Sequence, residues 1–324
     1  MFKRVELYKA LPLDTPFSVQ ISPSNHCNFR CRYCNQSLSD DVLAKKNFRR
    51  EFMDFSLFKK LVDDITCFSK KIKAFIIVGY GEPLLHKNIV DMVDYAKRRD
   101  IADRVEIVTN GSLLTKEMSD ALIDAGLDSL KVSIQGVDGD AYRATMGRKF
   151  DFDKFLAQLK YFFDHKKHTK MNCKIIDVAF RTKDEEQEFR RIFNPVCDET
   201  TIECEVPIIP EAENKSDFST TRYGMAVKKV NICPPLFYLM LVHANGDVVP
   251  CCSFDRPVTI GNIGSESLID IWNGTKLKQL RIMHLQGKRN KNPICARCEL
   301  PSLNFPRENY LDGHEAALLQ HYEV

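Results

Sequence analysis

The sequence predicts an α/β protein: a partial, TIM-like (β/α)6 barrel followed by a small C-terminal domain of a β-hairpin and helices. Between Phe17 and Val206, six short β patterns alternate with helical ones, and this alternation favours a parallel sheet with right-handed crossovers. The segment Ile72–Val78 is almost continuously apolar, as expected for a parallel strand covered on both faces. Six strands are too few for a closed eight-fold barrel, so we expect an open one.

Each element follows from hydrophobic periodicity and from the residues that begin or end it. The predicted strands are Phe17–Ser22, Ile72–Val78, Arg104–Thr109, Ser129–Ile134, Ile175–Phe180 and Thr200–Val206. Helices are predicted where apolar residues recur at helical spacing, in the segments 55–65, 89–96, 115–126, 152–163 and 185–193. Thr115 can cap the third of these helices, and Gly126 can end it. Because functional groups in such sheets lie beyond the carboxyl ends of the strands, we expect the site there.

The chain divides into four predicted parts. Residues 1–210 form the barrel, and residues 211–228 form a linker, because the stretch Glu211–Tyr223 is polar and poor in long apolar side chains. Residues 229–306 differ in composition from the barrel: they contain closely spaced cysteines and turn signals such as Asn245-Gly246-Asp247, which predict a small separate domain. Residues 307–324 are expected to form a helical tail of no assigned role.

Composition excludes several classes of partner. The 324 residues include 47 Lys and Arg against 44 Asp and Glu, a net charge of +3, scattered apart from short basic stretches such as Lys288–Lys291. We therefore expect no nucleic-acid partner. The first residues lack the apolar core of a signal peptide, and the longest apolar run, Pro234–Val242, is too short to cross a membrane. These features predict a cytoplasmic protein without a membrane partner, whose 12 cysteines are metal ligands and buried thiols rather than disulfides.

The strongest chemical signal is a run of three cysteines, Cys27, Cys31 and Cys34, directly after the first predicted strand, with Tyr33 before the third. Three thiolates on one loop can hold a cubane iron–sulfur cluster and leave one of its four irons open to bind a substrate or cofactor. A zinc site and disulfides are the alternatives. A closed zinc site usually takes four ligands, often as two Cys-x2-Cys pairs, and the Cys-x3-Cys-x2-Cys spacing fits that poorly.

This motif closely resembles the signature of the radical S-adenosylmethionine (SAM) superfamily. Further motifs of that superfamily follow the next three predicted strands in the same order: Gly79-Tyr80-Gly81-Glu82-Pro83, Thr109-Asn110-Gly111 and Ser133-Ile134-Gln135-Gly136. The resemblance covers about Phe17 to Val206. It implies an open, partial barrel, which agrees with the fold predicted from the alternating elements.

The resemblance implies that Cys27, Cys31 and Cys34 hold a [4Fe–4S] cluster whose fourth iron is chelated by the amino and carboxylate groups of SAM. Reduction of the cluster, by an electron donor such as flavodoxin or ferredoxin, then cleaves SAM and yields a 5′-deoxyadenosyl radical that takes hydrogen from the substrate. The residues that it implies for SAM binding are Tyr33, Gly79, Gly81, Glu82, Pro83, Asn110, Ser133 and Gln135. Gln135 stands where many relatives carry an acidic residue.

A second cysteine pattern lies in residues 229–306. Cys233 is followed by twelve residues, Gly246, four residues and Cys251, and a Cys-x2-Cys pair, Cys295 and Cys298, comes later. This pattern closely resembles the auxiliary-cluster domains called SPASM and, in a shorter form, Twitch. The resemblance implies one auxiliary [4Fe–4S] cluster with four thiolate ligands, which favours electron transfer over substrate binding. A zinc ribbon is the alternative.

Cys252, next to a predicted ligand, is either a small buried residue or a hydrogen-atom donor to a substrate radical. By resemblance we expect oxidation of an alcohol of a sugar or aminocyclitol, with the auxiliary cluster as electron acceptor. The alternatives within the superfamily are epimerisation, with Cys252 as the donor, and maturation of a peptide or protein by thioether or formylglycine formation. A non-catalytic iron–sulfur sensor is the alternative outside the enzymes, and the intact SAM motifs argue against it.

Overall fold

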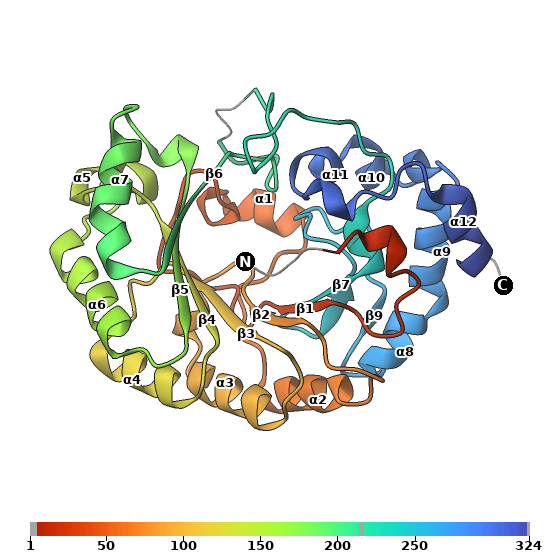
Figure 1. Cartoon of the computed structure of the whole chain (residues 1–324), viewed down its shortest axis with the longest axis horizontal. Helices are drawn as coiled ribbons and strands as arrows, with labels where there is room; N and C mark the ends of the chain where they lie inside the picture. The colour runs from red at the N-terminus through yellow and green to blue at the C-terminus, as the bar shows by residue number, and fades with distance from the viewer. Residues whose placement is uncertain (1–4, 214–216, 323–324) are drawn as a thin grey trace.

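The computed structural model describes residues 5–213 and 217–322, which form one curved sheet with helices around it (Figure 1). In these residues the sheet has nine strands in the order β6-β5-β4-β3-β2-β1-β7-β8-β9. The first six are parallel to one another: β1 Ser18–Ile21, β2 Ala74–Ile77, β3 Val105–Thr109, β4 Ser129–Ile134, β5 Lys170–Ile176 and β6 Glu199–Glu203. The predicted partial α/β barrel is therefore confirmed.

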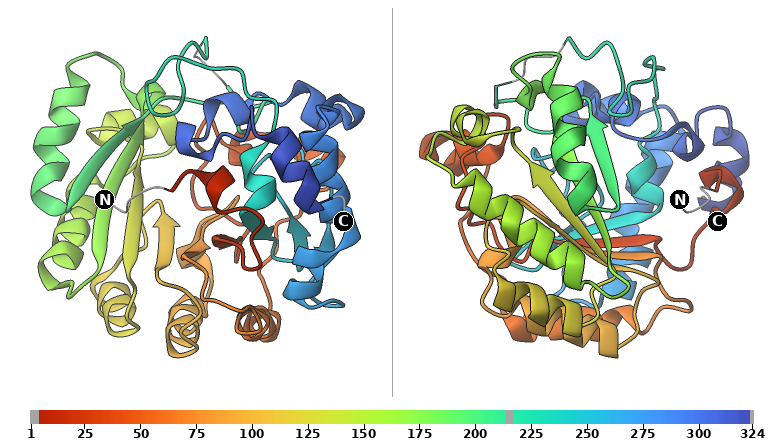
Figure 2. Two further views of the ribbon diagram at one scale, coloured as in Figure 1. Left: turned by 45° about the vertical axis from the view of Figure 1, so that its right-hand side comes forward. Right: turned by 60° about the vertical axis from the view of Figure 1, so that its left-hand side comes forward.

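Helices cover the convex face of the barrel, as the two views of Figure 2 show. They are α2 Phe55–Ile65, α3 Ile89–Arg98, α4 Lys116–Asp124, α6 Phe152–His165 and α7 Glu185–Phe193. Thr115 caps α4 as expected, by accepting a hydrogen bond from the Met118 N–H at 3.2 Å, and Gly126 follows with a φ of 78°. Two short helices in the loops beyond the strands, α1 Asp40–Lys45 and α5 Gly139–Met146, were not predicted.

The two faces of each strand differ in polarity. On β4, Val132 and Ile134 are buried against the helices, whereas Lys131 and Ser133 on the inner face are half-buried. Glu106 on the inner face of β3 pairs with Lys131 at 2.9 Å and with Arg104 at 3.1 Å. The inner face of the barrel therefore carries charged and polar side chains.

The fifth and sixth strands differ from the prediction. A strand was expected over 175–180, but β5 ends at Ile176 and a 3-10 turn follows at Asp177–Ala179. The predicted sixth strand extended to Val206, whereas β6 ends at Glu203. The reason is the polar inner face, where Lys174 of β5 pairs with Glu203 at 3.2 Å. Strands that carry charged residues on one face do not show a continuous apolar run, so their bounds cannot be predicted from such a run.

The C-terminal segment continues the barrel sheet. It contributes β7 Leu239–Val242, β8 Asp247–Val249 and β9 Gly261–Asn262. β7 lies parallel to β1, with Leu239 opposite Ser18, and β8 and β9 follow as antiparallel neighbours. All residues of β7 are buried, which explains its place inside a sheet rather than in a small solvent-exposed hairpin. The expected turn at residues 245–247 is present, and the domain boundaries stay a prediction.

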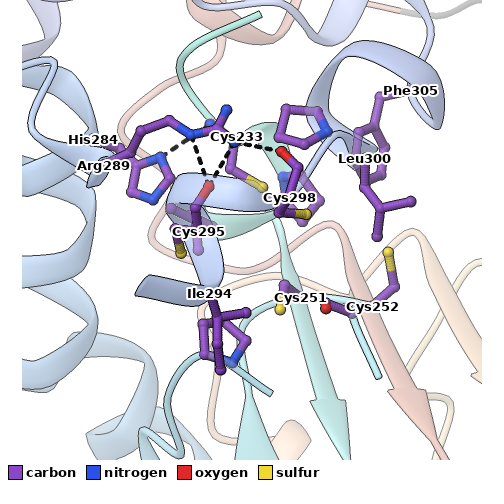
Figure 3. A pocket seen from close by; sticks show the side chains of 15 residues that line it. Cys233, Cys251, Cys252, His284, Arg289, Ile294, Cys295, Cys298, Leu300 and Phe305 are labelled. Atoms are coloured by element: carbon purple, nitrogen blue, oxygen red, sulfur yellow. Dashed lines mark hydrogen bonds between the residues drawn. The ribbon is translucent and has the colours of Figure 1, made fainter. Parts of the chain in front are cut away.

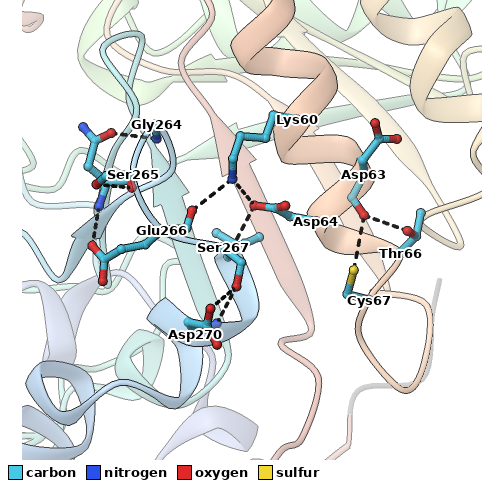
Figure 4. A network of polar contacts seen from close by, with 12 residues as sticks. Lys60, Asp63, Asp64, Thr66, Cys67, Gly264, Ser265, Glu266, Ser267 and Asp270 are labelled. Carbon is cyan, nitrogen blue, oxygen red and sulfur yellow. Dashed lines mark hydrogen bonds and ion pairs between the residues drawn. The ribbon is translucent and has the colours of Figure 1, made fainter.

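The remaining helices lie on the side of the sheet formed by β7 to β9 (Figure 1): α8 Leu268–Asn273, α9 Thr275–Leu285, α10 Pro293–Arg297, α11 Leu300–Leu303 and α12 Glu315–Tyr322. Polar contacts tie α2 to the start of α8 (Figure 4). Lys60 donates to Asp64 at 2.9 Å and to the Glu266 carbonyl at 3.0 Å, and Asp64 accepts from the Leu268 N–H at 3.0 Å. No helix of the described residues is both long and apolar enough to span a membrane.

Candidate active site

The first cysteine loop lies beyond the carboxyl end of β1, as predicted. Its three thiols are partly to fully buried, and the Cys34 N–H donates to the Cys31 carbonyl at 2.9 Å, which closes a tight turn. The Cys31 thiol donates to Gln135 Oε1 at 3.4 Å, and the Tyr33 hydroxyl donates to the same oxygen. Gln135 follows β4, so this contact joins the loop to the end of a strand about 100 residues away.

The three thiols of the loop are close enough to influence one another's pKa. Burial raises the pKa of Cys27 to about 12 and holds the pKa of Cys31 well above its ordinary value. After burial, the largest effects on the Cys31 pKa come from the Cys34 and Cys27 thiolates, so the sulfurs lie near one another. Buried thiolates need positive charge beside them, which bound metal supplies. The donor set therefore fits an iron–sulfur cluster.

The glycine turn after β2 packs directly against the cysteine loop. A Cβ on Gly81 would lie 2.3 Å from the Ser24 carbonyl oxygen and 2.5 Å from that of His26. The Glu82 N–H donates to the His26 carbonyl at 2.8 Å, one residue before Cys27. The close approach at Gly81 is to the chain itself, and it fixes where the cysteine loop begins. A contact of Gly81 with SAM stays a prediction.

Glu82 joins two of the predicted motifs. Its buried carboxylate accepts from the Leu84 N–H at 2.9 Å, the Thr109 hydroxyl at 2.6 Å and the Asn110 N–H at 2.7 Å. Pro83 is the first residue of the 3-10 turn, Pro83–Leu85, that follows. The turns after β2 and β3 are thereby held as one unit. A direct contact of Glu82 with SAM stays a prediction.

Asn110 and Ser133 lie at the same end of the barrel. Asn110 Nδ2 donates to Asn28 Oδ1 at 2.9 Å, and Asn28 Nδ2 donates to Ser112 Oγ at 2.8 Å. The Ser133 carbonyl accepts from Gln135 Nε2 at 3.1 Å. Asn28 and Ser112 were missed, although Asn28 lies inside the cysteine motif, because spacing does not tell which loop residues face the strand ends.

The second group of cysteines lines one cavity (Figure 3). Cys233 precedes β7, Cys251 follows β8, Cys295 lies in α10, and Cys298 directly follows that helix. Burial raises the pKa of the Cys233 thiol, and the thiolates of the other cysteines raise it further, so these sulfurs also converge. The four predicted ligands are brought together, and the donor set fits a second cluster.

Two residues of this cavity were missed. Arg289 donates to the Cys295 carbonyl from Nε at 3.0 Å and from Nη2 at 2.6 Å, and Nη2 also donates to the Cys298 carbonyl. His284 accepts a hydrogen bond from the Cys233 N–H at 3.3 Å. Burial, and next the charge of Arg289, lowers the pKa of His284 to about 4. Their partners are backbone atoms, so no side-chain motif reveals them.

Cys252 lies at the side of the cavity. In Figure 3 its sulfur points toward Leu300, whereas the Cys251 sulfur points another way. The sulfur accepts a hydrogen bond from Asn304 Nδ2 at 3.5 Å, and the Tyr80 hydroxyl donates to the Cys252 carbonyl at 3.3 Å. Cys252 therefore connects the auxiliary cavity to the glycine turn after β2. Its role as a hydrogen-atom donor stays a prediction.

Comparison with known proteins places the chain. The model of the radical SAM superfamily matches residues 21–192, and that of the SPASM iron–sulfur cluster-binding domain matches residues 233–299. The chain belongs to the radical SAM superfamily. As a radical SAM enzyme it uses SAM and a [4Fe–4S] cluster, and its SPASM domain implies an auxiliary iron–sulfur cluster. The family and the cofactors predicted from the motifs are confirmed.

Two curated relatives match most of the chain. The tungsten-containing aldehyde ferredoxin oxidoreductase cofactor-modifying protein of Pyrococcus furiosus is 25% identical over 317 residues, covering 86% of this chain and 85% of the relative. The S-adenosyl-L-methionine-dependent 2-deoxy-scyllo-inosamine dehydrogenase of Niallia circulans is 25% identical over 290 residues, covering 88% and 94%. The crystal structure of Streptococcus suis SuiB bound to precursor peptide SuiA has a TM-score of 0.65 at 18% identity, covering 85% and 69%, which shows the shared fold.

Proposed function

We propose that this radical SAM enzyme oxidises an alcohol of a small sugar or aminocyclitol and passes one electron to its auxiliary cluster. The observation that carries the proposal is the cavity lined by Cys233, Cys251, Cys295 and Cys298, a complete thiolate set. A fully ligated cluster has no open iron for a substrate, so electron transfer is its natural role. The dehydrogenase relative that matches 88% of this chain supports the same reaction.

Cys27, Cys31 and Cys34 would hold the catalytic cluster. When bound, this cluster and SAM supply a 5′-deoxyadenosyl radical that takes a hydrogen atom from the substrate carbon. The chain would contribute orientation: Glu82 fixes the two turns that face SAM, and Gln135 fixes the cysteine loop against β4. The polar side chains of the strand ends, with Asn110 and Ser133 among them, would bind SAM, as would Tyr33, Gly79, Gly81, Glu82, Pro83 and Gln135.

Conversion of CH–OH to C=O requires loss of a hydrogen atom, a proton and an electron. The radical that the bound cofactors would supply would take the hydrogen atom, and a cluster held by Cys233, Cys251, Cys295 and Cys298 would accept the electron. The proton needs a base on the inner face, for which the Lys174–Glu203 pair, with nitrogen and oxygen 3.2 Å apart, is the candidate. Burial lowers the pKa of Lys174, which makes its neutral form easier to reach.

Iron content and SAM cleavage test the assignment. Anaerobically reconstituted protein should bind about eight irons. Replacing Cys27, Cys31 and Cys34 by Ala should leave about four irons and abolish 5′-deoxyadenosine formation. Replacing Cys233, Cys251, Cys295 and Cys298 should also leave about four irons but spare SAM cleavage. Zinc in the second site of the wild-type protein would contradict the proposal.

The reaction itself is tested with a panel of sugars and aminocyclitols in deuterated water. The proposal expects a ketone or aldehyde without carbon-bound deuterium, and the Cys252→Ala variant should keep this turnover. A deuterated stereoisomer from wild type, together with SAM consumption but no product from Cys252→Ala, would establish epimerisation instead. Turnover of a short precursor peptide only would establish maturation.

A further inference from the structure

His284, on α9, lines the auxiliary cavity and is 1% exposed. Its Nδ1 atom accepts a hydrogen bond from the Cys233 N–H at 3.3 Å. Its Nε2 atom is buried and has no hydrogen-bond partner within the described residues. Figure 3 shows the ring beside Arg289, near Cys233. One nitrogen of this ring therefore has a partner, and the other has none within hydrogen-bonding distance. The Asn231 backbone also interacts with the ring and raises its pKa, but less than burial and Arg289 lower it.

The contact at Nδ1 determines where the proton of the ring lies. A ring nitrogen that accepts an N–H carries no proton, so the neutral imidazole carries its proton on Nε2. Nε2–H is then a buried hydrogen-bond donor without an acceptor, which is unfavourable and rare in native proteins. Apart from the cysteines, the cavity is lined mostly by apolar groups such as Leu236 and Ile294. The acceptors that a loaded cavity offers are thiolate and sulfide sulfurs.

We propose that His284 donates a hydrogen bond from Nε2 to a sulfur of the auxiliary cluster and thereby raises the reduction potential of that cluster. The proposal rests on the proposed function in placing an iron–sulfur cluster in this cavity. Reduction adds negative charge, and a hydrogen bond to sulfur stabilises the more negative state. Arg289, whose guanidinium binds the Cys295 and Cys298 carbonyls, adds a fixed positive charge on the same side. The two residues suit a cluster that accepts an electron.

The test measures the auxiliary cluster alone, in the full-length Cys27→Ala, Cys31→Ala, Cys34→Ala chain. His284→Phe keeps a ring of similar size without the donor, and His284→Gln keeps an N–H donor. A redox titration followed by electron paramagnetic resonance should show the Phe variant reduced about tenfold less readily, a fall of about 59 mV for one electron. The midpoint potential of the Gln variant should lie closer to that of the parent chain. The parent and both variants should each hold about four irons.

A second measurement does not depend on any His284 variant folding. In the same parent chain carrying 15N-labelled histidine, pulsed electron paramagnetic resonance should detect histidine nitrogen and an exchangeable proton coupled to the reduced cluster. An unchanged midpoint in iron-loaded His284→Phe, or no such coupling in the parent, would overturn the role of His284 alone. A parent chain that binds no iron would instead overturn the proposed function at this site, and the inference with it.

Discussion

The contact between the glycine turn and the cysteine loop can be tested with Gly81→Ala. The added Cβ would lie 2.3 Å from the Ser24 oxygen and 2.5 Å from the His26 oxygen, where 3.4 Å or more is ordinary, so the loop must move by about 1 Å. Overpacking of this kind costs about 1–3 kcal/mol. Loss of the 2.8 Å hydrogen bond from Glu82 N–H to His26 adds about 1 kcal/mol. We expect the free energy of unfolding to fall by about 2–4 kcal/mol.

The same shift should disturb catalysis, because His26 directly precedes Cys27. A displacement of about 1 Å costs on the order of a hundredfold in rate, so 5′-deoxyadenosine formation should fall by about that factor. Gly313→Ala is the matched control: Gly313 has a φ of 94° and nothing within 4 Å of its Cβ, so only backbone strain of about 1–2 kcal/mol is expected. Urea unfolding and single-turnover SAM cleavage measure both effects. Wild-type cleavage by Gly81→Ala would refute the reasoning.

Three further perturbations concern Trp272, Arg289 and His243. Trp272 is buried, and its Nε1–H donates to the Leu13 carbonyl at 3.0 Å. Trp272→Ala should lower the free energy of unfolding, measured in urea, by about 3–5 kcal/mol, and Trp272→Phe should lower it clearly less. Arg289→Leu frees the turn between Cys295 and Cys298, so a chelator should remove auxiliary iron severalfold faster than from wild type. Burial lowers the pKa of His243 to about 3, so the unfolded state binds more protons below pH 6.5 and stability falls as the pH drops from 6.5 toward 3. Between pH 7.5 and 5.5 this effect should lower the free energy of unfolding of the wild-type protein by about 1.4 kcal/mol. His243→Phe should lack that part of the decrease, as measured by urea unfolding at both pH values.

Local patterns predicted the part of the site that depends on parallel strands. Once β1 to β4 are parallel neighbours, their following loops must meet at one edge, and the structure brings Gln135 to Cys31 and Asn110 to Asn28 there. The helix cap at Thr115 could also be predicted, because its hydrogen-bond partner, the Met118 N–H, lies only three residues away in the sequence. In both cases the information lies in neighbouring residues or in a general rule of sheet topology.

The missed features depend on contacts that no local pattern encodes. β7 pairs with β1 although more than 200 residues separate Ser18 from Leu239. A short apolar run predicts a strand but not the strand with which it pairs. β5 was placed too late because Lys174 faces a charged inner surface. His284 and Arg289 were missed because they bind backbone atoms of Cys233, Cys295 and Cys298, and such partners leave no side-chain signature.

The pairing of β7 with β1 bears on the proposed chemistry. β1 leads into the first cysteine loop, and β7 leads from Cys233 into the hairpin that ends at Cys251, so one parallel ladder supports both cysteine groups. Tyr80 adds a second connection, because it lies in the glycine turn and its hydroxyl donates a hydrogen bond to the Cys252 carbonyl at 3.3 Å. A sheet resists shear between neighbouring strands far better than a linker between separate domains does. The separation between the two cofactors would therefore be fixed by the barrel itself, as a one-electron acceptor for a substrate radical requires.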